Sequence, residues 1–335
     1  MKPVVFGLSG PRLTPDERAF FADADPAGYI LFKRNVVDRG QLRALTDELR
    51  ALAGRDDLAI LIDQEGGRVA RMGPPEWPSF PAGPAFDRLY DVAPASAIEA
   101  ARSNAWAIGM MLAEVGITVD CLPLLDLALP ETTPAVAERA FGRDPLRVAA
   151  LGRATLDGLA RAGVAGVVKH MPGHGRARVD SHHELPVVTA DEAALEDDIR
   201  PFRSLAGASM GMTAHVVYTA WDADRPATLS PTVIERIIRG RIGFDGLLFT
   251  DDIDMKALSG TPGEKAAAAI AAGCDVVLDC WGRMAEMVEI VSRLDDMAPL
   301  GSARLARAMA ALTTARDGAD MAELIATRDA LLALA

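Results

Sequence analysis

Short runs of apolar residues recur along the chain, and longer amphipathic segments separate them. Eight runs of five to nine residues stand out, at 3–8, 28–32, 58–62, 117–125, 165–169, 209–214, 246–250 and 275–279. Short apolar runs that alternate with helical patterns are typical of buried β-strands. We therefore predict a strand in each of the eight runs.

The segments between these runs carry apolar residues with a period of about 3.6, which is typical of amphipathic helices. Clear examples lie at 38–54, 95–116, 144–163, 191–207 and 263–273, and each ends at a glycine, a residue that often terminates helices. Eight strands that alternate with helices predict a (β/α)8 barrel of the TIM type rather than an open doubly wound sheet.

No linker and no shift in composition divides the chain into parts. Its length of 335 residues is compatible with one large α/β barrel. We predict a single catalytic barrel domain over residues 1–335, in which the helices from about residue 300 onward pack on the outside of the barrel.

Composition narrows the choice of partners and compartment. The chain has 35 basic and 47 acidic side chains, a net charge of −12 and no basic block, so nucleic acid and anionic membranes are not expected partners. Its first apolar run is too short for a signal peptide, and no stretch approaches the roughly 20 apolar residues of a membrane span. The three cysteines lack CxxC spacing and predict reduced thiols in the core. We expect a cytoplasmic protein and, because no interface motif is visible, a monomer.

Polar side chains gather directly after several predicted strands. The segments are DQEGGRVAR (63–71), KHMPGHGRARVDSHHELP (169–186), HVVY (215–218) and DDIDM (251–255), and a further long connection ends in ERAFGRDP (138–145). Barrel enzymes carry their chemistry at the carboxyl ends of the strands. The connections after the fourth and fifth strands run to about twenty residues, a length that is usually functional in a compact domain.

The first of these segments places an acid at a strand end and two arginines close by. Asp63 could accept hydrogen bonds from two neighbouring hydroxyls of a ligand, and Arg71 could fix a polar ligand with its planar guanidinium. An internal ion pair that closes the loop is the alternative. In ERAFGRDP, Arg139 and Arg143 cannot be separated by spacing, whereas Asp144 is expected to cap the following helix.

Four of the five histidines lie between residues 169 and 186. A metal site would use His170 and His174, but their i, i+4 spacing aligns two imidazoles only in a helix, which Pro172 and Gly173 prevent. The HExxH pattern is also missing, so we expect no metal.

Asp180 and His182 have a different spacing. Residues two apart in an extended loop face the same way, so the carboxylate can orient the imidazole and leave its other nitrogen for a substrate. Such a pair could act as a general acid and base. The alternative is a loop histidine that is merely satisfied by its neighbour, and His183 is expected to face away.

Two acids, Asp251 and Asp252, end the seventh predicted strand. Because side chains alternate along a strand, only one of them can share the inward face with Lys169 and His170, and the sequence does not say which. A carboxylate there could be a covalent nucleophile or an electrostatic partner of Lys169. A helix N-cap, from Asp252 or Asp254, is the alternative.

Taken together, DQEGGRVAR, ERAFGRDP, KHMPGHG followed by DSHHELP, MTAHVVY and GFDGLLFTDDIDM resemble the bacterial β-N-acetylhexosaminidases of glycoside hydrolase family 3, the NagZ type. The match runs in order from about residue 5 to residue 280. The resemblance implies a single-domain cytoplasmic barrel that releases N-acetylglucosamine from muropeptides carrying 1,6-anhydro-N-acetylmuramic acid during cell-wall recycling.

The resemblance also implies roles for individual residues. Asp251 corresponds to the catalytic nucleophile, and His182 with Asp180 corresponds to the acid/base pair. The family's sugar-binding positions fall on Asp63, Arg71, Arg139, Lys169 and His170. The implied reaction is a double displacement that retains the β configuration, with a small sugar substrate and no cofactor.

Three other functions remain open at this point. One is a glycoside phosphorylase, because an imidazole that is neutral when deprotonated repels an anionic acceptor less than a carboxylate would. Another is a metallohydrolase on the same barrel. A non-catalytic sugar-binding barrel is disfavoured, because Asp251 and the Asp180–His182 pair are intact. The preference for the leaving group and for a peptide stem stays undetermined.

Overall fold

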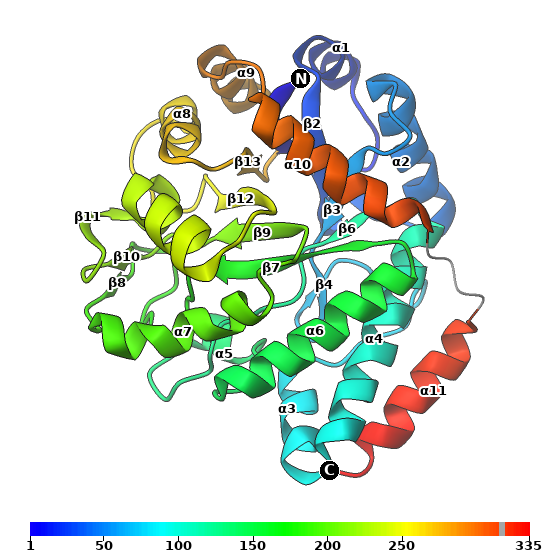
Figure 1. Ribbon diagram of the computed structural model, residues 1–335. Helices are drawn as coiled ribbons and strands as arrows, with labels where there is room; N and C mark the ends of the chain where they lie inside the picture. The colour runs from blue at the N-terminus through cyan, green and yellow to red at the C-terminus, as the bar shows by residue number, and fades with distance from the viewer. Residues whose placement is uncertain (315–318) are drawn as a thin grey trace.

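The computed structural model describes residues 1–314 and 319–335, in which eight parallel strands form a closed barrel (Figure 1). The order around the barrel is β1, β13, β12, β9, β7, β6, β3 and β2. Their bounds are β1 Lys2–Gly7, β2 Pro26–Leu31, β3 Ala59–Ile62, β6 Val119–Asp120, β7 Ala165–Met171, β9 Met210–Thr213, β12 Leu247–Asp252 and β13 Val276–Asp279. Each predicted apolar run overlaps one of these strands, so the predicted (β/α)8 barrel is confirmed.

Helices surround the barrel, including all five that the periodicity predicts. These five are α2 (Arg39–Ala53), α4 (Pro94–Glu114), α6 (Pro145–Arg161), α7 (Glu192–Ser204) and α8 (Pro262–Ala272). The other α-helices of the described residues are α1 (Pro15–Ala24), α3 (Gly83–Val92), α5 (Pro134–Ala137), α9 (Met284–Arg293), α10 (Pro299–Ala310) and α11 (Met321–Leu332). There are also a π-helical segment, η3 (Val233–Ile242), and short 3-10 helices η1 (Lys33–Asn35), η2 (Ala227–Leu229) and η4 (Ala311–Thr314). Asp144 caps α6 as predicted, since its carboxylate accepts a hydrogen bond from the Arg147 N–H.

Strand alternation divides the core into two layers. One layer joins the outward faces of the strands to the helices and includes Val4, Phe6, Tyr29, Leu31, Ile60, Ile62, Val168, Leu248 and Val277. The other fills the barrel interior with Val5, Ile30, Leu61, Val167, Leu247, Phe249, Val276 and Leu278. The predicted reduced thiols are confirmed, because all three cysteines are buried and free.

Helix α10 contributes to the interior layer through Leu305, Ala308 and Met309. Arg304 on this helix anchors it through ion pairs with Asp245 (2.8 Å) and Asp275 (3.0 Å), which flank the starts of β12 and β13. Figure 1 shows α10 crossing the barrel and α11 lying beside α4. The amino-terminal end of the barrel is therefore covered, and the opposite end carries the polar loops.

Strand β6 is shorter than the predicted run 117–125. After Asp120 only an isolated bridge joins the chain to β7, between Leu124 and Lys169. Pro123 has no N–H to donate to the neighbouring strand, which accounts for the interrupted ladder.

Small strands in the loops shape the carboxyl end of the barrel. A hairpin of β4 (Gln64–Gly66) and β5 (Val69–Ala70) follows β3, and β8 (Val187–Val188), β10 (Val217–Tyr218) and β11 (Asp222–Pro226) form a three-stranded sheet. These elements hold the loops in which the candidate residues lie. None of the helices within 1–314 and 319–335 has the length and apolar character needed to cross a membrane.

Candidate active site

A cavity of about 480 Å³ opens at the carboxyl ends of the barrel strands. The interior-layer side chains Ile30, Met212 and Leu278 contribute apolar surface to it. All eight site residues expected from the sequence line it: Asp63, Arg71, Arg139, Lys169, His170, Asp180, His182 and Asp251. Closure of the barrel thus gathers residues from five separate loops and strands into one site.

Asp251 lies on the inward face of β12, two residues after Phe249 of the interior layer. One oxygen of its carboxylate lies 3.8 Å from His170 Nε2, and the other accepts a hydrogen bond from the Asp252 N–H (2.8 Å). Burial would raise the pKa of Asp251, but His170, the hydrogen bond from the Asp252 N–H and the charge of Lys169 together outweigh it and lower the pKa. Asp251 is therefore an ionised carboxylate at neutral pH.

Asp252 has a different environment. Its carboxylate accepts hydrogen bonds from the backbone N–H groups of Asp254 (3.2 Å) and Cys280 (3.3 Å), which ties the end of β12 to β13. The helix-cap alternative is wrong for both Asp252 and Asp254, because the next helix, α8, begins only at Pro262 and is capped by Thr261. Burial raises the pKa of Asp252 to about 6.

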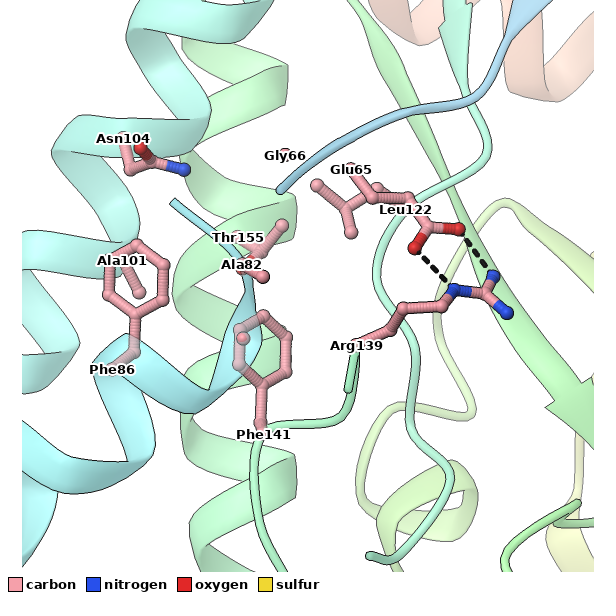
Figure 2. Close-up of a pocket in the computed structure, with 11 residues that line it drawn as sticks. Glu65, Gly66, Ala82, Phe86, Ala101, Asn104, Leu122, Arg139, Phe141 and Thr155 are labelled. Atoms are coloured by element: carbon pink, nitrogen blue, oxygen red, sulfur yellow. Dashed lines mark hydrogen bonds and ion pairs between the residues drawn. The ribbon is translucent and has the colours of Figure 1, made fainter. Parts of the chain in front are cut away.

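A chain of ion pairs forms the wall opposite Asp251. Asp63 binds Arg71 (2.8 Å) and faces Lys169 Nζ at 3.4 Å. Glu65 binds the same Nζ at 2.7 Å and holds Arg139 through two parallel hydrogen bonds of 2.7 and 2.5 Å. Figure 2 shows the paired Glu65 and Arg139 side chains. Asp63 and Arg71 form the internal ion pair that was one alternative, and both also line the cavity, as a ligand-binding role would require.

These charges stabilise one another despite their burial. Burial would raise the pKa values of Asp63 and Glu65, but Lys169 and the arginines lower both, that of Glu65 to about 2. Burial would lower the pKa of Lys169, but the two carboxylates raise it. The wall therefore presents fixed charged donors and acceptors of hydrogen bonds to the cavity.

Glu65 is a residue that the sequence reasoning missed. It lies two positions beyond Asp63 in the hairpin strand β4, so alternation places both carboxylates on one side. That spacing was the available signal. Behind the ion pair lies a small pocket with an apolar wall of Phe86, Ala101 and Phe141, which shields the charges on that side (Figure 2).

His170 is oriented by Asp126, a second residue without a predicted role. Asp126 is fully buried and accepts hydrogen bonds from His170 Nδ1 (2.7 Å) and from the backbone N–H of His174 (2.7 Å). The His170 Nε2 atom is thereby turned towards Asp251. His174 Nε2 lies 3.3 Å from Ser181 Oγ, so His174 joins the base of the histidine loop to its tip.

Asp180 and His182 are paired as predicted, but the geometry is that of a turn. The Asp180 carboxylate oxygen Oδ1 accepts hydrogen bonds from His182 Nδ1 (2.7 Å) and from the His182 backbone N–H (3.0 Å). The Asp180 carbonyl accepts from the N–H groups of His183 and Glu184, so the segment is not extended. The expectation that His183 faces away is wrong, because in this turn His183 also lines the cavity.

The Asp180–His182 pair is more exposed than the ion-pair wall. Burial would raise the pKa of Asp180, but its hydrogen bonds from His182 lower it. The His182 side chain is 64% exposed, and no hydrogen bond engages its Nε2 atom among the residues that the structure describes. That nitrogen is therefore available for proton transfer at the mouth of the cavity.

His215 supports the end of β12 from behind. Its Nε2 atom donates to the Asp252 carbonyl (2.9 Å), which can only accept, so Nδ1 accepts from the Thr228 hydroxyl (2.7 Å). Burial lowers the pKa of His215 and keeps the ring neutral. The sequence marked HVVY as a polar segment but assigned no role to this histidine.

The structure separates the two arginines that spacing could not. Arg139 lines the cavity, whereas Arg143 is exposed, lies outside it and has no ion pair within the described part of the chain. Across residues 1–314 and 319–335, no cluster of three or more His, Cys, Asp or Glu side chains has the arrangement of a metal site.

An ionised aspartate and an imidazole held by a second aspartate lie in one polar cavity of a barrel, and groups of these kinds are capable of nucleophilic attack and of proton transfer. A barrel with such a site is compatible with the glycoside hydrolase class. The chain belongs to glycosyl hydrolase family 3, because the model of the family's N-terminal domain matches residues 5–314.

Two relatives that this chain is similar to are named β-hexosaminidases. A β-hexosaminidase from Aromatoleum aromaticum is 39% identical over 309 residues, which cover 90% of this chain and 86% of the relative. A β-hexosaminidase from Chromobacterium violaceum is 39% identical over 332 residues, covering 98% and 91%.

Among solved structures, the chain is similar to NagZ from Neisseria gonorrhoeae in complex with N-trifluoroacetyl-D-glucosamine. The identity is 31% and the TM-score 0.86, over 99% of this chain and 98% of that one. It is also similar to a family 3 β-N-acetylglucosaminidase from Paenibacillus (30% identity, TM-score 0.84, 98% of this chain), whose longer chain it spans to 66%. The resemblance inferred from the sequence motifs is confirmed.

Proposed function

We propose that the protein is a retaining exo-β-N-acetylglucosaminidase that acts on muropeptides of the N-acetylglucosaminyl-1,6-anhydro-N-acetylmuramic acid type. The carrying observation is that the ionised Asp251 and the Asp180–His182 pair line one cavity. The names of the relatives support the hexosaminidase activity. In this proposal the chain works as a single catalytic domain and a monomer in the cytoplasm, within cell-wall recycling.

In the first step, a carboxylate oxygen of Asp251 attacks the anomeric carbon. A covalent bond forms between them as the bond to the leaving oxygen breaks, through an oxocarbenium-like transition state. His182 donates a proton to that leaving oxygen, and Asp180 stabilises the imidazole by holding its Nδ1–H. The low pKa of Asp251 keeps it ionised for the attack.

In the second step, water attacks the anomeric carbon and displaces Asp251. His182, now neutral, takes the proton from this water and returns to its starting state. Two inversions at one carbon leave the β configuration unchanged. The exposure of His182 at the cavity mouth is compatible with entry of water after the leaving group departs.

The ion-pair wall supplies the sugar contacts in this proposal. Asp63 accepts hydrogen bonds from sugar hydroxyls, while Lys169 and Arg139 donate to sugar oxygens. Arg71 and His170 complete the set. Because Glu65 and Asp126 already hold these side chains, little conformational entropy is lost when a sugar binds.

The test is hydrolysis of a chromogenic N-acetyl-β-glucosaminide by the wild type, Asp251→Ala and His182→Ala, with the first-formed anomer read by NMR. We expect β product, a loss of about 10³-fold or more for Asp251→Ala, and for His182→Ala a loss of about 10²- to 10⁴-fold that is confined to poor leaving groups. Near-normal turnover by Asp251→Ala, or α product, would disprove the mechanism. Formation of a sugar phosphate on addition of phosphate would favour the phosphorylase alternative.

A further inference from the structure

One wall of the cavity has no part in the proposed reaction. In the barrel order β1 lies four strands away from β7 in either direction, so the wall above β2, β1 and β13 faces Lys169 and His170 across the opening. Beyond the ends of the strands, this wall contributes Phe32 and Arg34, which follow β2, and Trp281, which follows β13, to the cavity lining.

Arg34 differs from the other basic side chains of the cavity lining. Four of these form ion pairs: Arg68 with Glu138, Arg71 with Asp63, Arg139 with Glu65, and Lys169 with Asp63 and Glu65. Within the described residues Arg34 has no carboxylate inside ion-pair distance. Its charge is thus free to attract an anion that enters the cavity.

The guanidinium of Arg34 is nevertheless held rigidly. Its Nε donates to the carbonyl of Leu8 (2.7 Å), and its Nη2 donates to the carbonyl of Cys280. The group lies over the ring of Phe32, 4.9 Å from the centroid, and 5.8 Å from that of Trp281. This leaves Nη1 without a partner in the described structure. A fixed, half-satisfied guanidinium is pre-organised for binding.

Gly7 makes the placement possible. A Cβ at this position would lie 2.1 Å from the Cys280 carbonyl oxygen and 3.0 Å from Arg34 Nη2. Two carboxylates act on Arg34 from a greater distance, those of Asp252 and Asp279. Burial raises the pKa of the former to about 6 and of the latter to about 7, so near neutral pH they compensate its charge incompletely.

We propose that Arg34 and Trp281 form a second subsite, which binds a carboxylate carried by the leaving-group sugar. Arg34 binds the carboxylate, and the 47% exposed Trp281 offers an apolar face to the same sugar. The inference deepens the proposed function and rests on it, and it concerns leaving sugars whose lactyl carboxyl is free rather than joined to a peptide stem. It makes Arg34 a specificity-determining residue for acidic over neutral leaving groups.

The test uses two N-acetylglucosaminyl disaccharides that differ only in the lactyl group of the leaving sugar, a free carboxylate or its methyl ester. Both are measured on the same enzyme sample, so the ratio of their kcat/KM values does not depend on the fraction of folded protein. We expect the wild type to favour the acid about 10- to 100-fold, Arg34→Gln to bring the ratio close to one, and Arg34→Lys to retain part of it.

Arg283→Gln is the matched control. Arg283 also stacks on Trp281 (5.0 Å), but it lies outside the cavity lining and pairs with Glu286 and Asp254. This variant should keep the wild-type ratio. In the wild type, raising the ionic strength should also lower the ratio by screening, a measurement that remains available if Arg34→Gln does not fold.

The outcomes separate the two proposals. Hydrolysis of both disaccharides with equal kcat/KM in the wild type, or an acid preference that persists in Arg34→Gln, would overturn the subsite and leave the glucosaminidase intact. Failure of the wild type to cleave either disaccharide and the chromogenic glucosaminide would instead overturn the proposed function.

Discussion

Glu65 offers the sharpest test of how the ion-pair wall is stabilised. Its side chain is 4% exposed and forms ion pairs with both Lys169 and Arg139. The substitution Glu65→Gln keeps the shape of the side chain and removes its charge. Asp63 at 3.4 Å is then the one carboxylate within ion-pair distance of Lys169 in the described structure, and Arg139 has none there, although it keeps its hydrogen bond to the Ala135 carbonyl.

Two arguments give the same magnitude. Removing one partner from a buried ion pair destabilises a protein by about 3–5 kcal/mol. Independently, the fall in the pKa of Glu65 from 4.5 to about 2 corresponds to about 3 kcal/mol. Because the folded-state pKa is depressed, this stabilisation is complete above the ordinary pKa of 4.5 and is lost as the pH falls towards 2.

The assay is urea unfolding at pH 7, followed by circular dichroism. With an m value of about 3 kcal/mol per molar, Glu65→Gln should lower the midpoint by about 1 M. The control is Glu48→Gln, which removes the surface pair between Arg18 and Glu48, whose side chains are 45% and 35% exposed. Such pairs contribute less than about 1 kcal/mol. Equal midpoints for the two variants would refute the reasoning.

Two further changes test the groups around β12 and β13. Burial raises the pKa of Asp279 from 3.8 to about 7, so ionisation of this carboxyl increasingly destabilises the fold as the pH rises above 3.8. The variant Asp279→Asn should therefore be more stable than the wild type by about 4 kcal/mol at pH 8 and by about 2 kcal/mol at pH 5.5. Urea midpoints at the two pH values check this, and a difference that grows towards acid pH would contradict it. Thr228→Val leaves His215 Nδ1 and the Thr213 hydroxyl without their partner, so stability should fall by about 1–3 kcal/mol and kcat should fall more than KM changes. Steady-state kinetics of soluble protein check the second effect, and an unchanged kcat would show that His215 does not position the end of β12.

Local sequence patterns determined much of this molecule. The eight apolar runs predict the strands and the amphipathic segments predict the helices, because both periods follow from backbone geometry alone. The Asp144 cap and the pairing of Asp180 with His182 are also local, since each involves atoms only a few residues apart. In the second pair, a turn rather than the expected extended loop brings the two side chains together.

The tertiary structure alone decided which groups meet across the barrel. Because side chains alternate along β12, only one of Asp251 and Asp252 can face inward. Phe249 packs in the barrel interior, and this makes Asp251, two residues later, the inward one. Glu65 and Arg139 are 74 residues apart in the chain, and no local pattern relates them. A periodicity reports the conformation of one segment. The distance between two segments depends on how all eight strands close into the barrel, and that closure places the charges of the site.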